Sequence, residues 1–352
     1  MKKPLQPLGE LGLIEMIRRR FPAAGKSITF GIGDDCAILR PPARSEILVT
    51  TDLTLEGRHF RRDLHPPESV GHRCLARGLS DLAAMGATPL AAFLSLALPA
   101  PMLAKAEGRA WVERFFDGLH ALGEMHRVPL AGGDTSESPG GSSAAILADI
   151  VLIGVAPKGE ALRRSGAEAG DVLYVTGQLG GSAAEFTAML TRQKRIPRAS
   201  PTDDHPQLFP EPRLDVGEAL LRRKLATACI DLSDGLSTDL THLCQASGVS
   251  AEIDQAAVPI HPLASKLGEG AALHVALHGG EDYELLFAAP ASVMMPTSLA
   301  GVSVTRIGSL KKNRSGRPRI TLVGSDGTRA ELKAGGWEHF SKVTKSQRKR
   351  PR

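Results

Sequence analysis

The spacing of apolar residues divides the first half of the chain into alternating helices and strands. Three segments, 8–21, 68–79 and 104–126, place apolar residues at helical intervals, which predicts three helices. In the first, the expected apolar face consists of Leu8, Leu11, Ile14, Ile17 and Phe21. Short apolar runs predict the intervening strands, at 27–30, 46–52, 90–98, 128–131 and 144–155. After the first helix, the order β-β-α-β-α-β-β predicts a mixed sheet with helices.

A segment rich in glycine and proline, 156–170, separates this half from a second one of similar design. We predict a strand at 172–176, a glycine turn and a helix from Ser182. An apolar run at 225–230 leads into a helical pattern that starts near Leu236. A helix and two late strands are also expected, at 214–223, 302–307 and 319–323.

Length and composition agree with two domains of ordinary size. The chain has 352 residues, of which 42% are hydrophobic and 23% charged, a balance typical of globular proteins. The fold class is therefore α/β (α+β), with an N-terminal mixed sheet and a C-terminal α/β domain. We place these domains at 1–156 and 157–340, with a basic, disordered tail at 341–352.

The net charge of +5 comes from that tail. Its cations outnumber the whole surplus, and they are Lys342, Lys345, Arg348, Lys349, Arg350 and Arg352. A solvated tail is the simplest interpretation, and a role on nucleic acid or another anionic surface is the alternative. Aromatic residues make up only 4% of the chain, so stacking platforms for single-stranded nucleic acid are scarce.

Cysteine usage and hydropathy indicate a cytoplasmic protein. The four cysteines form neither a CxxC pair nor a zinc spacing, and they are Cys36, Cys74, Cys229 and Cys244. Such a chain is typical of a reducing compartment. No continuous apolar core follows Lys2 and Lys3, so we expect no signal peptide. The most apolar segment, 90–104, is short and contains two prolines, so we expect no membrane span.

Carboxylates follow many of the predicted apolar runs, mostly beside Gly, Ser or Thr. They are Asp34, Asp35, Asp52, Asp81, Asp134, Asp231, Asp234 and Glu281. So many acids at strand and helix ends predict one acidic cleft that binds several Mg²⁺ ions, which normally arrive with substrate phosphates. Gly25-Lys26-Ser27 is not a Walker loop, because Arg20 stands where the first glycine is required. The pattern therefore predicts metal-assisted phosphoryl transfer without a Walker loop.

Each of these signals also has a simpler interpretation. Ser233 or Asp234 is suited to cap the following helix and need do nothing more. Arg163-Arg164-Ser165-Gly166 is either a phosphate grip or a solvated basic loop. His59 is either a site residue or an ordinary surface histidine.

Seven sequence blocks together resemble a known family. In chain order they are GIGDDCAIL, TTDLTLEGRHF, SDLAAMGATP, AGGDT, LRRSGA, IDLSDGLSTDL and GGEDYELLF. They resemble the thiamine-monophosphate kinase family, within the superfamily of aminoimidazole ribonucleotide synthetase, over about residues 8–340. The resemblance implies ATP-dependent phosphorylation of thiamine monophosphate to thiamine diphosphate. It also implies a homodimer whose N-terminal sheets join.

The resemblance also implies roles for single residues. The implied Mg²⁺ ligands are Asp34, Asp35, Thr50, Thr51, Asp52, Asp81, Asp134, Asp231 and Asp234. The implied ATP contacts are Gly133, Asp134, Arg164 and Ser233. The implied thiamine phosphate pocket contains His59, Glu281 and Trp337. The family often has an aromatic residue shortly before the GGD block, where this chain has Met125 and His126.

The acceptor implied by the resemblance is a phosphate monoester, already a competent nucleophile, so we assign no catalytic base. Three rival functions remain. A selenophosphate or aminoimidazole ribonucleotide synthetase would keep the superfamily, but selenide chemistry would want a reactive cysteine before Gly31, and none lies there. A nucleotide-binding regulator should lack cleft acids, and all are present. A nucleic-acid binder should depend on residues 341–352 and on salt.

Overall fold

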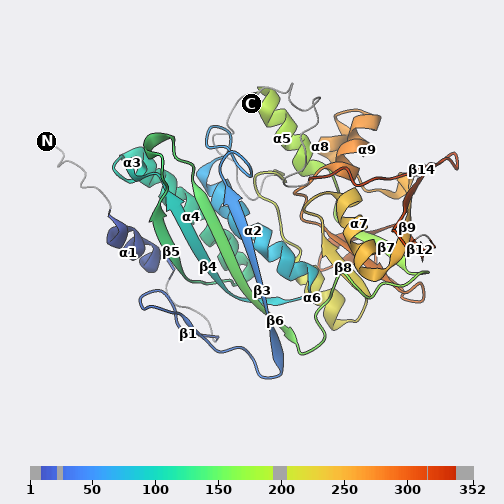
Figure 1. The fold of residues 1–352 in the computed structure, drawn as a ribbon, viewed down its shortest axis with the longest axis horizontal. Helices are drawn as coiled ribbons and strands as arrows, with labels where there is room; N and C mark the ends of the chain where they lie inside the picture. The colour runs from blue at the N-terminus through green and yellow to red at the C-terminus, as the bar shows by residue number, and fades with distance from the viewer. Residues whose placement is uncertain (1–8, 22–26, 193–203, 315, 338–352) are drawn as a thin grey trace.

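The computed structural model describes residues 9–21, 27–192, 204–314 and 316–337. Within these ranges the chain forms two main sheets, one from each half (Figure 1). Residues 341–352, the expected tail, and Leu8 of the expected first helix lie outside the described residues.

The N-terminal half is built on a four-stranded mixed sheet in the order β3-β6-β4-β5. β6 pairs antiparallel with β3 and β4, while β5 runs parallel to β4. Its strands are β3 (Ser45–Leu55), β4 (Thr88–Leu98), β5 (Leu130–Glu137) and β6 (Leu147–Pro157). The helices are α1 (Glu10–Arg20), α2 (Pro67–Ala84), α3 (Ala100–Leu103) and α4 (Ala106–His126), with a 3-10 turn η1 (Gly141–Ser143). A small hairpin of β1 (Ile28–Phe30) and β2 (Ile38–Leu39) precedes the sheet.

The C-terminal half forms a second mixed sheet in the order β14-β13-β9-β12-β7-β10-β8, with β11 paired to β12. Its strands are β7 (Val172–Thr176), β8 (Ala228–Asp231), β9 (Val249–Asp254), β10 (Leu285–Ala289), β11 (Ser298–Leu299), β12 (Val302–Lys312), β13 (Ile320–Val323) and β14 (Arg329–Glu331). Its helices are α5 (Gly181–Arg192), α6 (Leu214–Arg222), α7 (Leu236–Ser247), α8 (Pro262–Ser265) and α9 (Glu269–His278), with a 3-10 turn η2 (Gln255–Ala257).

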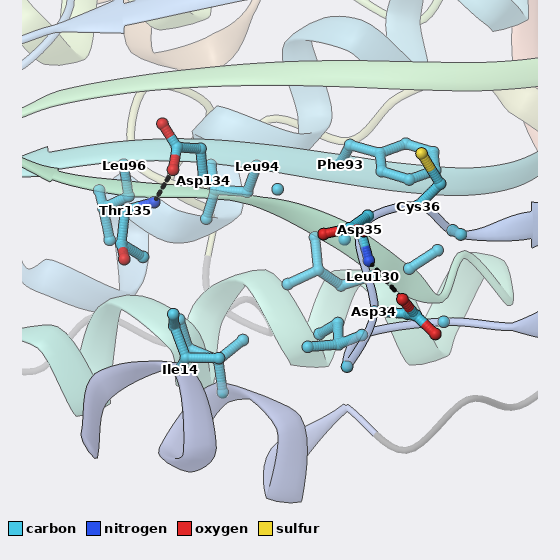
Figure 2. Close-up of a pocket in the computed structure, with 18 of the residues that line it drawn as sticks. Ile14, Asp34, Asp35, Cys36, Phe93, Leu94, Leu96, Leu130, Asp134 and Thr135 are labelled. Atoms are coloured by element: carbon cyan, nitrogen blue, oxygen red, sulfur yellow. Dashed lines mark hydrogen bonds between the residues drawn. The ribbon is translucent and has the colours of Figure 1, made fainter. Parts of the chain in front are cut away.

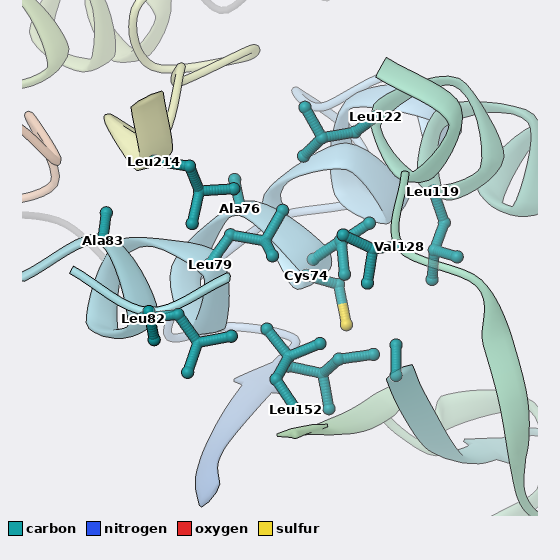
Figure 3. Close-up of a cluster of buried hydrophobic side chains, with 14 of the residues drawn as sticks. Cys74, Ala76, Leu79, Leu82, Ala83, Leu119, Leu122, Val128, Leu152 and Leu214 are labelled. Atoms are coloured by element: carbon teal, nitrogen blue, oxygen red, sulfur yellow. The ribbon is translucent and has the colours of Figure 1, made fainter. Parts of the chain in front are cut away.

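Helix α2 lies between the two sheets and is buried along nearly its whole length. Its apolar residues share one core with α4, with the N-terminal sheet and with α6, as the cluster around Leu79 and Leu152 shows (Figure 3). Cys229 and Phe287 of the C-terminal sheet belong to the same core, while Ile230, on the opposite face, packs with α7. Alternate strand residues therefore bind the second sheet to α2 on one side and to α7 on the other.

Two glycines let α2 and α4 approach closely. A Cβ atom on Gly71 would lie 1.8 Å from the carbonyl oxygen of Phe115. A Cβ atom on Gly118 would lie 1.8 Å from the carbonyl oxygen of Glu68. Any larger side chain at either position would force the helices apart, so these glycines set the close spacing of α2 and α4.

The predicted elements occur in the predicted order, but several boundaries differ, and β2, α3, β9, α8, α9, β11 and β14 were not predicted. Helix α2 continues through Asp81 instead of ending near residue 79. The Gly133-Asp134 pair lies inside β5 and not beyond its end, and Asp52 likewise lies inside β3. Leu11, expected on the apolar face of α1, is 82% exposed, whereas Leu13 and Ile17 are buried.

Candidate active site

One large cavity, of about 750 Å³, lies against the β5 edge of the N-terminal sheet. The loop from Gly31 to Ala37 borders it together with β5, β4 and one face of α1 (Figure 2). Asp34 and Asp134 each accept a hydrogen bond from the backbone N–H of the next residue, at 2.9 Å. Apolar side chains, including Phe93 and Phe116, form the rest of the lining. We call this cavity the first pocket; it combines an apolar wall with an acidic rim.

A smaller cavity, of about 290 Å³, lies between the two halves of the chain, and we call it the second pocket. Its volume is near the lower end of the range typical of small-molecule sites. Segments distant in sequence contribute to it, and its lining residues are Asp52, Arg58, His59, Arg77, Asp81, Ala183, Phe186, Gln207, Asp231, Ser233, Asp234, Gly280, Glu281, Tyr283 and Trp337.

The carboxylates of the second pocket are close enough to raise one another's pKa. Burial, and then the neighbouring Asp81 carboxylate, raise the pKa of Asp231 to about 7. Burial also raises the pKa of Asp81, which accepts a hydrogen bond from the Thr50 hydroxyl. Burial raises the pKa of Asp52 against the opposing effect of Arg77. Such a group of acids repels itself, and a multivalent cation with hard oxygen preference would relieve the repulsion.

Two arginines on α2 hold Glu281 in place. Arg73 donates to Oε1 of Glu281 at 2.8 Å, and Arg77 approaches the same oxygen at 3.2 Å. Burial alone would raise the pKa of Glu281, but the two guanidiniums lower it below its ordinary value. The backbone of Glu281 has a φ of 67°, an uncommon conformation for a residue with a side chain. The ion pairs therefore hold an ionised carboxylate on an unusual turn at the pocket wall.

The start of α7 is organised by Asp239 and not by Ser233 or Asp234. Gly235 occupies the cap position, and Oδ2 of Asp239 accepts the backbone N–H groups of Asp234 and Gly235 at 3.0 Å each. The simpler interpretation, in which Ser233 or Asp234 only caps this helix, is therefore wrong. Both residues instead line the second pocket.

The expected single acidic cleft is divided in two in this chain. Asp34, Asp35 and Asp134 line the first pocket, whereas Asp52, Asp81, Asp231 and Asp234 line the second. Strand pairing places Asp134 beside Ser95, Ser95 beside Asp149, and Asp149 beside Leu53. This row crosses three strand spacings, about 14 Å. Asp134 and Asp52, one from each group, are therefore too far apart to share one ion within the chain.

The other predicted site residues lie as follows. Gly133 lines the first pocket, and Ser233, His59, Glu281 and Trp337 line the second. The positive charge of Arg164 reaches Asp81 and Asp231, because it partly offsets the rise in the pKa that burial causes at both carboxylates. Thr50 joins the second group through its bond to Asp81. Thr51 is exposed and alternates with Thr50 along β3, so its side chain lies on the opposite face of the sheet.

Met125 and His126 are not among the residues of the first pocket, where Phe93 and Phe116 are the aromatic residues. Three functional residues, Arg73, Arg77 and Asp239, were not predicted from the sequence. Arg73, Arg77 and Asp81 follow one another at four-residue intervals on an otherwise apolar helix. That spacing places all three on one face of the helix. Charged side chains on a buried helix require partners, so the pattern could have indicated a charged site on this face.

Comparison with known proteins places the chain in a family. The AIR synthase related protein family matches it twice, through the N-terminal domain at residues 33–156 and the C-terminal domain at residues 168–307. Thiamine-monophosphate kinase of Salmonella typhimurium is 38% identical over 342 residues, which cover 95% of this chain and 98% of the relative. The chain belongs to the thiamine-monophosphate kinase family. The Escherichia coli K12 member is also 38% identical, over 340 residues and the same shares of both chains.

Solved structures of the family have the same fold. The crystal structure of thiamine-monophosphate kinase from Stenotrophomonas maltophilia K279a aligns with a TM-score of 0.76 at 34% identity, covering 92% of this chain and 99% of that one. A second structure, AaThiL complexed with AMPPCP and TMP, aligns with a TM-score of 0.70 at 32% identity, covering 95% and 97%.

The described residues contain neither a ready-made metal site nor a helix that could span a membrane. No three His, Cys, Asp or Glu side chains there converge into a ready-made metal site. Mg²⁺ often binds to only one or two carboxylates and completes its coordination shell with water and phosphate oxygens. The aspartates of each pocket therefore fit this ion. Across the same ranges, every helix is too short or too polar to cross a membrane.

Proposed function

We propose that this protein is an ATP-dependent kinase that converts thiamine monophosphate to thiamine diphosphate. The observation that carries the proposal is the second pocket, which gathers His59, Glu281 and Trp337 around the same cavity as Asp81 and Asp231. The family relationship supports it, since relatives over nearly the full length of the chain are thiamine-monophosphate kinases. A relative of known structure was also solved with the ATP analogue AMPPCP and TMP.

We assign the nucleotide to the first pocket and the acceptor to the second. Gly133 and Asp134 would contact ATP in the first pocket. Arg164 and Ser233 would meet the phosphate chain beside the second pocket, where His59, Glu281 and Trp337 would surround the thiamine moiety. Phe93 and Phe116 provide the apolar surface for the base in place of Met125 and His126.

The carboxylates of both pockets would hold Mg²⁺. In the second pocket the candidate ligands are Asp52, Asp81, Asp231 and Asp234, and the raised pKa of Asp231 is the charge repulsion that such an ion would relieve. In the first pocket they are Asp34, Asp35 and Asp134. Bound Mg²⁺ would neutralise the charge that develops on the phosphoryl oxygens.

The chain's own residues would supply positioning. Direct in-line transfer needs the acceptor phosphate held against the nucleotide, and the acceptor is already ionised, so we assign no general base. Glu281, fixed by two arginines, and His59 would orient the acceptor, while the apolar walls would limit the access of water.

We further propose a homodimer formed through the N-terminal sheets, in the reducing cytoplasm. Ile47, Val49 and Leu53 lie on the face of β3 opposite to α2 and are 56%, 61% and 42% exposed. Three large, exposed apolar side chains on one face of a strand are typical of a surface that another chain covers. All four cysteines are unpaired, as expected for a reducing compartment. The domain division at residues 156 and 157 remains our proposal.

The decisive experiment is incubation of the protein with ATP, Mg²⁺ and thiamine monophosphate, followed by chromatography for thiamine diphosphate. We expect one thiamine diphosphate and one ADP per turnover. Free thiamine should not be phosphorylated, because the attacking atom is a phosphate oxygen. Efficient phosphorylation of thiamine, or ATP consumption only with another phosphorylated acceptor, would overturn the assignment.

A further inference from the structure

The guanidinium of Arg77 lies in the second pocket, between carboxylates from the two halves of the chain. Nε and Nη2 both contact Oδ1 of Asp52, at 2.8 and 2.7 Å. Nη1 lies 3.2 Å from Oε1 of Glu281 and 3.2 Å from the hydroxyl of Tyr283. The side chain keeps 14% of its surface exposed and lines the cavity, so a molecule bound there would meet it.

The lining of the pocket is strongly acidic, and Arg77 is one of its few cations. Five carboxylates and two guanidiniums, those of Arg58 and Arg77, line the cavity. Arg73 is also near but is only 1% exposed, and it donates to the carbonyl oxygens of Gln207 and His59 as well as to Glu281. Arg77 therefore combines a guanidinium that is fixed in place with access from the cavity.

This charge matters for the acceptor because a phosphate monoester carries about −1.5 to −2 charge near neutral pH. Carboxylates in a partly buried site repel such an anion unless cations offset them. The same molecule without its phosphate would not be repelled. The acidic lining therefore favours the unphosphorylated molecule, and each fixed cation shifts the preference toward the phosphate ester.

We propose that Arg77 is a specificity-determining residue, whose fixed guanidinium makes the second pocket select a phosphate ester over the same molecule without phosphate. The inference rests on the proposed function, since it explains how that site chooses its acceptor. Because the nucleotide is assigned to the first pocket, Arg77 affects acceptor binding and leaves nucleotide binding unchanged.

A purely structural role for Arg77 makes a different prediction. If the residue only ties β3 to the loop that contains Glu281, its loss lowers stability and weakens every ligand of the pocket in parallel. The ratio of the dissociation constants for thiamine and thiamine monophosphate separates a structural role from a role in specificity. A general loosening of the pocket changes both constants alike and leaves the ratio unchanged, whereas the loss of a charge changes the ratio.

The test is isothermal titration of the full-length protein with thiamine monophosphate and with thiamine, in buffer containing Mg²⁺ and no nucleotide. For Arg77→Gln we expect the Kd for thiamine monophosphate to rise about tenfold or more, and the Kd for thiamine to change less than about twofold. Arg77→Lys keeps the charge and should keep most of the selectivity. In kinase assays, Arg77→Gln should raise KM for thiamine monophosphate and leave KM for ATP unchanged.

Arg213→Gln is the matched control. Arg213 binds Glu284 through two contacts of 2.8 and 2.6 Å and is 17% exposed, but it lines a different cavity. Its loss should lower stability and leave the ratio unchanged. Where Arg77→Gln does not fold, Arg77→Met, which keeps an apolar stem, gives the same measurement. The inference alone is overturned if the wild type binds thiamine monophosphate and Arg77→Gln and Arg77→Met prefer it over thiamine as strongly as the wild type does. Wild-type protein that does not bind thiamine monophosphate overturns the proposed function as well.

Discussion

Replacing Asp231 with asparagine should stabilise the metal-free protein while abolishing its activity. Asp231 is 3% exposed, and burial together with Asp81 raises its pKa from 3.8 to about 7. One pKa unit corresponds to about 1.4 kcal/mol, so at about pH 8 the ionised carboxylate costs up to about 4 kcal/mol of folding free energy. An asparagine oxygen can still accept the bond from Ser80, which is 2.8 Å long. Its amide group costs about 1–3 kcal/mol if left unpaired, so we expect a net gain of about 2 kcal/mol.

The pH dependence of the unfolding free energy shows in which direction Asp231→Asn should change stability. The pKa of Asp231 is raised in the folded state, so the stability of the wild type is complete below the unfolded value of 3.8 and falls as the pH rises through about 7. The advantage of Asp231→Asn should therefore be largest at about pH 8 and shrink toward zero at about pH 5. Urea unfolding in excess chelator, at both pH values, measures it.

Asp282→Asn is the contrasting control. Burial raises the pKa of Asp282 to about 7 as well, but this carboxylate accepts the backbone N–H groups of Gly180 and Ser182 at 2.7 and 3.2 Å. An amide cannot replace both acceptors, so Asp282→Asn should gain less stability than Asp231→Asn at about pH 8 and should be destabilised at about pH 5. If Asp231→Asn is less stable than the wild type at about pH 8 in chelator, Asp231 is held by net attraction and the reasoning is refuted.

Three further predictions concern the metal, the tail and the core. Excess chelator should abolish turnover, and Mg²⁺ or Mn²⁺ should restore it; full activity in chelator would exclude the metal assignment. Deleting residues 341–352 should leave kcat nearly unchanged, and a large loss in a folded truncation would place the tail in the site. Gly118→Ala should lower the unfolding free energy by about 1–3 kcal/mol, because its Cβ would lie 1.8 Å from a carbonyl oxygen. Gly270→Ala, also helical but with no atom within 4 Å of the added Cβ, should not destabilise; equal melting temperatures for the two variants would contradict this account.

The sequence was sufficient to predict features that depend on the local pattern of apolar residues. The apolar run before Asp231 and the helical spacing after Gly235 placed that acid correctly at the end of β8. The predicted end of α2 at residue 79 was too early, because Leu82, Ala83 and Ala84 are good helix formers and continue the helix.

Long-range pairing was beyond local reasoning. Arg73 and Arg77 meet Glu281 across more than two hundred residues of chain, and no spacing rule indicates such a partner. The division of the acids into two pockets depends on the strand order β3-β6-β4-β5. That order places β6, from the end of the N-terminal half, between β3 and β4, and it decides which acids become neighbours.

Helix α2 has a consequence for how this protein can evolve. The same helix supplies Arg77 and Asp81 to the second pocket, and its Arg73 holds Glu281 at the pocket wall. Through Leu79 and Leu82 it also supplies the centre of the apolar core. Many enzymes carry their reactive groups on loops, which can vary while the scaffold stays constant. Here a substitution that repacks the core also displaces charged groups of the pocket. Stability and substrate preference are therefore expected to drift together in laboratory selection, and changes confined to one of them should accumulate in segments that do not touch α2.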